Sequence, residues 1–167
     1  AVPSVATEIL PMAVRDFLES YPSVQIDIRD MDSNAVLREM ERERVDIGLA
    51  TIGAVNSSIA AKNLFRDAFG IVCQTDHELA RRTEPLEWEE LAGLPFIANG
   101  ICEQIENETF QQLLLKSKLM VRNTTSLLAM VRSGVGITVL PQMAIANKEN
   151  LAFVPVNDPM ARRQIDV

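Results

Sequence analysis

The sequence has no apolar run that approaches the roughly 18 residues needed to cross a bilayer, and its start has no basic stretch of the kind that opens a secretory signal peptide. Cysteine is also scarce. The 2 cysteines are too few for a disulfide framework, which is consistent with a reducing compartment. We therefore expect a soluble, cytoplasmic protein with no membrane partner.

Clustered positive charge is missing as well. The chain has 16 Lys and Arg against 23 Asp and Glu, a net charge of -7, and the pairs Arg81-Arg82 and Arg162-Arg163 stand alone. Binding to nucleic-acid phosphates requires clustered Lys and Arg. Direct DNA binding by these 167 residues is therefore not expected.

Metal-binding and catalytic patterns are absent too. His77, the 1 histidine, has no metal-ligand spacing to Cys73 or Cys102, and no Ser or Cys lies beside it in the sequence as a candidate nucleophile. Glycines at 134 and 136 lack the surroundings of a dinucleotide-binding loop. The sequence predicts no metal site, no cofactor and no enzyme activity.

What is present indicates a globular α/β protein, since 47% of the residues are hydrophobic and 23% are charged. After Ser4, apolar residues four apart predict a helix, which Pro11 either ends near Leu10 or kinks. These apolar residues are Val5, Ile9, Ala13 and Phe17. Ser4 is a candidate helix cap, a candidate ligand contact, or both.

Strand and helix patterns then alternate. Residues 24–29 (VQIDIR) have the period of a half-buried strand, 34–44 that of an amphipathic helix capped by Ser33, and 45–51 (VDIGLAT) that of a short buried strand. Such an order predicts a right-handed parallel crossover. Ligands of these folds bind at the carboxyl ends of the strands, here the loops 1–5, 30–34 and 51–54.

The second half of the chain repeats the alternation without repeating the sequence. No linker separates the halves, so we expect two α/β lobes joined by crossover strands. The predicted strands are 69–74, 94–99, 119–123, 136–141 and 151–156, and the predicted helices are 87–93, 106–117, 125–133 (stopped by Gly134) and 141–147.

Several segments, in this order, resemble the effector-binding domain of LysR-type transcriptional regulators, a two-lobed relative of the type 2 periplasmic binding proteins. They are VPSVATEILP, YPSVQIDI, VDIGLAT, FRDAFGIVCQTDHELARR, LEWEELAGLPFI, LLAMVRSGVGITVLP and LAFVPVNDP. The resemblance implies two Rossmann-like lobes joined by two crossover strands. Lobe I is expected at 1–71 plus 153–167, and lobe II at 72–152.

Family members carry a DNA-binding helix-turn-helix and a first strand ahead of this region, and a last helix after it. The resemblance therefore implies that the sequence is truncated at both ends and that DNA is bound only through the absent N-terminal domain. It also implies self-association into dimers and tetramers. We expect helices 35–45 and 125–133 to take part.

The resemblance places a small effector in the cleft between the lobes. Its contacts are expected from Ser4, Val5, Ser33, Thr51, Ala98, Asn99, Gly100, Thr124 and Thr125. Unpaired N–H groups at helix N-termini favour an anion, which predicts a small carboxylate, with Arg29 and Arg122 as possible contributors of charge. A single Ser or Thr before a helix is more often only a cap, and both interpretations stay open.

Cys102 precedes a predicted helix, near where peroxide-sensing LysR members keep a reactive cysteine. A helix N-terminus lowers a thiol pKa, but Glu103, Glu106 and Glu108 raise it, and no resolving cysteine follows. A packed thiol is the favoured interpretation and a redox sensor the alternative. A solute-binding protein of the same fold and an enzyme on this fold are further alternatives; the enzyme would need a nucleophile and base pair that the sequence does not show.

Overall fold

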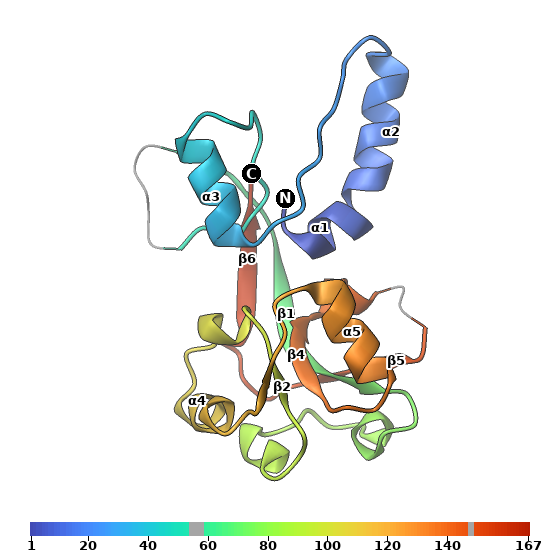
Figure 1. Cartoon of the computed structure of the whole chain (residues 1–167), viewed down its shortest axis with the longest axis vertical. Helices are drawn as coiled ribbons and strands as arrows, with labels where there is room; N and C mark the ends of the chain where they lie inside the picture. Colours follow the sequence, from blue (N-terminus) through green and yellow to red (C-terminus); the bar gives the residue numbers. More distant parts are fainter. Residues whose placement is uncertain (54–58, 147–148) are drawn as a thin grey trace. The chain divides into compact units, whose positions relative to one another are not determined.

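A computed structural model describes residues 1–53, 59–146 and 149–167 (Figure 1). The chain forms two compact units, residues 1–66 with 164–167, and residues 67–163. It passes between them within the strands β1 (Asn63–Gln74) and β6 (Arg162–Asp166). The lobe boundaries predicted at 71/72 and 152/153 remain a prediction, because compact units need not coincide with lobes.

The first unit is mainly helical. Helices α1 (Pro3–Glu8) and α2 (Leu10–Ser20) meet at Ile9, and α3 (Ser33–Glu41) follows an extended segment (Figure 1). Pro11 lies at the second position of α2. A proline is tolerated there because the first turn of a helix has no partner for its N–H groups. The predicted interruption of the first helix is thus confirmed.

The strand predictions for 24–29 and 45–51 are wrong. Within the described residues, 22–32 belong to no strand, and 45–51 contribute only an isolated bridge between Ala50 and Asp166. The end of segment 24–29 is hydrogen-bonded to Ala1, whose amino group donates to the Arg29 carbonyl (2.8 Å). Elsewhere its alternating apolar side chains stay 41–49% exposed; they are Val24, Ile26 and Ile28. A period of two shows which faces a strand would have, but pairing also requires a partner strand.

In the second unit the sheet has the order β4-β1-β5, antiparallel throughout, with β6 also paired to β1. Its strands β4 (Thr138–Pro141) and β5 (Leu151–Pro155) confirm two of the predictions. The other strands, β2 (Ile97–Ala98) and β3 (Leu119–Met120), form a separate parallel pair.

Helices α4 (Glu108–Leu115) and α5 (Thr124–Arg132) of the second unit confirm the helices predicted at 106–117 and 125–133, and Gly134 follows α5 with φ 76°. The predicted helices 87–93 and 141–147 are instead short 3-10 turns, η2 (Trp88–Leu91) and η4 (Gln142–Ile145), with Pro141 one residue before η4. Two further 3-10 turns are η1 (Glu78–Arg81) and η3 (Cys102–Gln104).

From Phe69 to Cys73, strand β1 is buried on both of its faces, which accounts for the continuous apolar run there. Phe69 and Ile71 pack in one core cluster, and Val72 packs in a second one beneath α5. The first cluster also holds Phe110, whose ring lies 4.6 Å from that of Trp88. The core of the second unit therefore fixes β1 and, through it, the neighbouring strand ends.

Candidate functional site

Two predicted site residues of the first unit are in direct contact. Ser33 is the first residue of α3, and its Oγ accepts a hydrogen bond from the Thr51 backbone N–H (3.1 Å). Ser33 is not the cap, contrary to the sequence-based prediction. Asp32 is the N-cap, and its Oδ1 accepts from the Ala35 N–H (2.8 Å). Because Asp32 caps α3, the hydroxyl of Ser33 binds the Thr51 backbone and keeps Thr51 beside the start of α3.

Ser4 does not cap its helix either. The N-cap of α1 is Val2, without a side-chain hydrogen bond, and Pro3 takes the first helical position. Ser4 and Val5 are buried, at 5% and 0% exposure. Because the Val2 N–H donates to the Leu49 carbonyl (2.9 Å), the start of α1 lies beside the segment that leads to Thr51.

In the second unit, the parallel strands β2 and β3 bring another group of predicted residues together. The Val121 N–H donates to the Ala98 carbonyl (2.9 Å), so the carboxyl ends of both strands are adjacent. Gly100 follows β2, and Thr124 and Thr125 are the first two residues of α5 after β3. Both lie at a helix start, and this edge is where α/β folds bind ligands, while their contact with an effector remains a prediction.

The side chain of Asn99, in the same loop, is hydrogen-bonded within the protein. Its Nδ2 donates to Thr138 Oγ1 (2.9 Å) and to the Val139 carbonyl (2.8 Å), while its Oδ1 accepts from the Ile101 N–H (2.8 Å). The residue is only 3% exposed. Its side chain therefore positions the loop after β2.

The two helix starts differ in charge, a difference that the sequence analysis missed. A carboxylate, Asp32, caps α3, whereas the neutral amide of Asn123 caps α5 by accepting from the Ser126 N–H (3.0 Å). Both caps lie directly before a Ser or Thr that is equally suited to the role, which explains the wrong choice of Ser33. An anion is consequently disfavoured at α3 and tolerated at α5.

The two arginines considered as sources of charge also differ. Arg29 contacts Asp27 (2.9 Å) and Glu39 (3.3 Å), so its charge is already compensated. Arg122 is exposed beside the start of α5 and forms no ion pair with a described residue. Of the two, Arg122 is the better placed to attract an anion.

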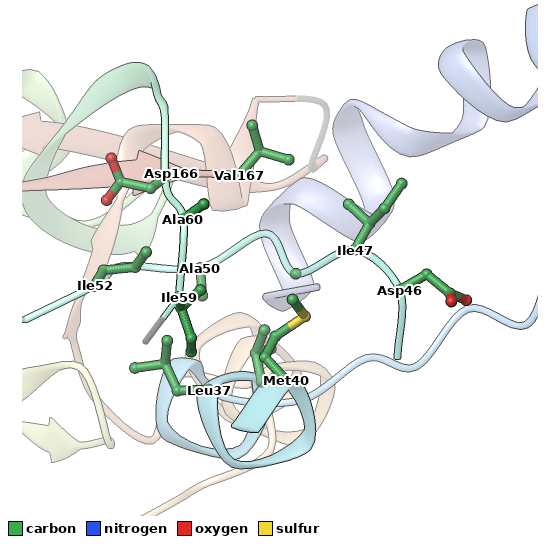
Figure 2. A pocket seen from close by; sticks show the side chains of 12 residues that line it. Leu37, Met40, Asp46, Ile47, Ala50, Ile52, Ile59, Ala60, Asp166 and Val167 are labelled. Atoms are coloured by element: carbon green, nitrogen blue, oxygen red, sulfur yellow. The ribbon is translucent and has the colours of Figure 1, made fainter. Parts of the chain in front are cut away.

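A cavity of about 160 Å³ lies within the first unit, and none of the predicted site residues lines it (Figure 2). Side chains such as Leu37, Met40 and Ile59 make its wall largely apolar. Asp46 and Asp166 also line it, and it is partly open to solvent. We interpret it as a gap in the packing beside α3.

Cys102 is fully buried at the start of η3, and its Sγ accepts from the Asn99 N–H at 3.5 Å. Burial raises the pKa of the Cys102 thiol to about 11. Burial likewise raises the pKa of Cys73 to about 11. Both groups are therefore protonated near neutral pH, which argues against a thiolate sensor.

We predict that neither cysteine of the folded protein reacts with iodoacetamide at pH 7.5, and that both react once the protein is unfolded in guanidinium. Intact-mass spectrometry under the two conditions measures this. Selective modification of Cys102 in the folded protein, or its oxidation by mild peroxide, would restore the redox alternative.

His77, the remaining reactive side chain, caps η1 by accepting from the Leu79 N–H at Nδ1 (3.1 Å). Among the described residues, no cluster of His, Cys, Asp and Glu is suited to hold a metal ion. The helices in that same part of the chain are all too short or too polar to span a bilayer.

A comparison with known families matches residues 1–167 to the LysR substrate binding domain. The chain belongs to this family. A curated relative, the uncharacterized HTH-type transcriptional regulator YbhD of Escherichia coli (strain K12), is 26% identical over 99% of this chain. The match covers 54% of YbhD, so this LysR-family chain spans about half the length of that relative.

Solved structures agree on the fold. The BenM effector binding domain with benzoate superposes with a TM-score of 0.73 at 18% identity, covering 99% of this chain and 78% of that one. The effector binding domain of QuiR with shikimate gives the same TM-score and identity, covering 99% and 82%. These similarities confirm the predicted LysR-type α/β fold, related to the type 2 periplasmic binding proteins.

Proposed function

We propose that this LysR substrate-binding domain is the sensing part of a transcriptional regulator and that it binds a small carboxylate. The observation that carries the proposal is the family match over all 167 residues. DNA would be bound by a helix-turn-helix region of the complete protein, as the description of the relative YbhD implies. Effector binding would act by favouring one arrangement of the protein over another, in proportion to its difference in affinity for the two.

The chemistry of the predicted residues supports a carboxylate. Ser33 and Thr51 in the first unit, and Thr124 and Thr125 in the second, offer hydroxyl groups that orient a polar ligand. The neutral cap of α5 and the exposed Arg122 suit negative charge, while Asp32 at α3 opposes it. We therefore assign the carboxylate of the effector to the start of α5, and propose Ser33 and Thr51 as hydroxyl groups suited to uncharged polar groups of a ligand. Benzoate and shikimate, held by BenM and QuiR, are both carboxylates.

Isothermal titration calorimetry with benzoate, shikimate and further small carboxylates tests the proposal, with benzamide as the uncharged control. We expect saturable binding of at least one carboxylate. Replacing both Thr124 and Thr125 by Val should weaken it about tenfold, since two polar contacts at the charged group are lost.

Ser33→Ala and Ser4→Ala test the other half of the predicted site, and Ser20→Ala in the exposed α2 is the control. We expect weaker binding from Ser33→Ala and no change from the control. Binding that is unaffected by Ser4→Ala and Ser33→Ala would contradict the placement of the effector at these residues. If no carboxylate binds, the effector class itself is wrong.

Self-association of this LysR-family domain is also part of the proposal, but the helix predicted to mediate it in the second unit is poorly suited. Leu127, Leu128 and Val131 of α5 are buried in the core of their own unit. Helix α2 has no buried residue and exposes apolar side chains; they are Met12 (63%), Phe17 (43%), Leu18 (37%) and, just after it, Tyr21 (56%). This exposure supports α2 as the contact surface.

We expect Phe17→Glu to shift the chain from dimer towards monomer, because it places a charge in the centre of the apolar face of α2. Sedimentation equilibrium measures the change, with Glu19→Gln on the same helix as the control. An unchanged association constant for Phe17→Glu would exclude α2 from the contact.

A further inference from the structure

A buried ion pair lies where the chain crosses between its two units. Asp67 is the first residue of the second unit on β1, and Arg163 is the last residue of that unit on β6. The Arg163 guanidinium contacts Asp67 Oδ2 at 2.8 Å, and the two side chains are only 5% and 7% exposed. The pair therefore joins the two strands at the point where both leave the second unit.

The Asp67 carboxylate has a second partner. Its Oδ1 accepts a hydrogen bond from the Met143 backbone N–H (3.3 Å), in the first turn of η4, just beyond β4. The backbone of β1 is bound to β6 close by, since the Phe69 N–H donates to the Ala161 carbonyl (2.8 Å). One carboxylate thus connects β1 with β6 and with the start of η4.

Such a pair is a poor source of stability. Removing two charges from water costs several kcal/mol per ion, and apolar residues of similar size often replace a buried pair without loss of stability. Burial indeed lowers the pKa of Arg163, which shows that its surroundings disfavour the charge, although Asp67 acts in the opposite direction.

The pair does constrain geometry. A shift of one residue between β1 and β6 would turn one of the two side chains to the opposite face of the sheet. The other charge would stay buried without its partner, which is strongly unfavourable. An apolar pair at these positions would tolerate such a shift far better.

We propose that Asp67 and Arg163 specify the register of β1 and β6 at the crossing and so restrict the conformations that the two units adopt relative to each other. In this role they are positioning residues. The inference does not depend on which effector binds, or on whether one binds, so it stands or falls separately from the proposed function.

Pulsed electron-electron double resonance measures the restriction. Spin labels are attached at Arg38→Cys on α3 and Lys116→Cys after α4, both exposed and one in each unit. The native Cys73 and Cys102 are fully buried and stay unlabelled. The labelled parent is compared with a variant that also carries Asp67→Leu and Arg163→Met, and with one that removes the more exposed pair Arg82–Glu90 by Arg82→Met and Glu90→Leu.

We expect a narrow distance distribution in the parent and in the Arg82–Glu90 control. The Asp67→Leu and Arg163→Met variant should broaden the distribution while its melting temperature stays within about 5 °C of the parent. An equally narrow distribution in that variant, or a broad one already in the parent, would overturn the proposal.

A second variant covers the case in which the apolar pair does not fold. Arg163→Lys keeps the charge but replaces the rigid guanidinium by a flexible ammonium group, so it should fold and give an intermediate broadening. A folded Arg163→Lys variant with the distribution of the parent overturns the proposal as well.

Discussion

Replacing Gly136 by alanine is expected to destabilise the second unit severely. Gly136 precedes Ile137, which bridges to Phe96, and a Cβ at position 136 would overlap the carbonyl oxygen of Pro95 and lie 3.0 Å from its carbonyl carbon. The obstacle is backbone, so no side-chain rotation relieves it. The same carbonyl accepts from the Ile137 N–H (2.8 Å), so a shift that relieves the overlap breaks this bond.

The cost should be about 3 kcal/mol or more, at the upper end of overpacking effects. Urea denaturation followed by the fluorescence of Trp88, the 1 tryptophan of the chain, measures it in the unit concerned. Gly100→Ala is the matched control, since a Cβ there meets nothing within 4 Å. If Gly136→Ala were as stable as Gly100→Ala, the close approach of 136 to Pro95 would be wrong.

The second large effect is expected from Asn99→Ala. The substitution leaves the Thr138 hydroxyl, the Val139 carbonyl and the Ile101 N–H without the amide that joins them inside the protein. Buried groups deprived of a partner cost about 1 to 3 kcal/mol each, so a loss on the order of 3 kcal/mol in unfolding free energy follows even if some of them find new partners.

Equilibrium denaturation of Asn99→Ala measures the loss, and Asn157→Ala, at an exposed position in the same unit, is the control. The result separates two roles for a residue that the sequence assigned to the effector site. A variant of normal stability with weakened carboxylate binding would show direct ligand contact, contrary to the structural role that its hydrogen bonds indicate.

Features determined by neighbouring residues were predicted well from the sequence. The break before α2 follows from Pro11, and the end of α5 from Gly134. Both effects are local, because proline restricts its own backbone and glycine allows a positive φ at its own position. Strands β4 and β5 were also found, since their apolar runs have β1 as a partner within the described chain.

Features that depend on distant residues were missed. The pattern at 24–29 is that of a strand, yet a strand forms only with a partner, and periodicity does not reveal one. Asp32 and Ser33 are both good helix caps by residue type, and the hydrogen bond that Ser33 accepts from Thr51, 18 residues away, could not be read from the sequence. The hydrogen bond from Asn99 to Thr138, 39 residues away, likewise could not be predicted from the sequence.

We propose that Gly100, Thr124 and Thr125, at the start of α5, bind the carboxylate group of a small effector. A ¹H-¹⁵N NMR titration of the whole chain with the carboxylate that binds best in calorimetry tests it most directly. We predict saturable shifts of the amide signals of these three residues. Shifts confined to the residues around the apolar cavity of the first unit would contradict this proposal.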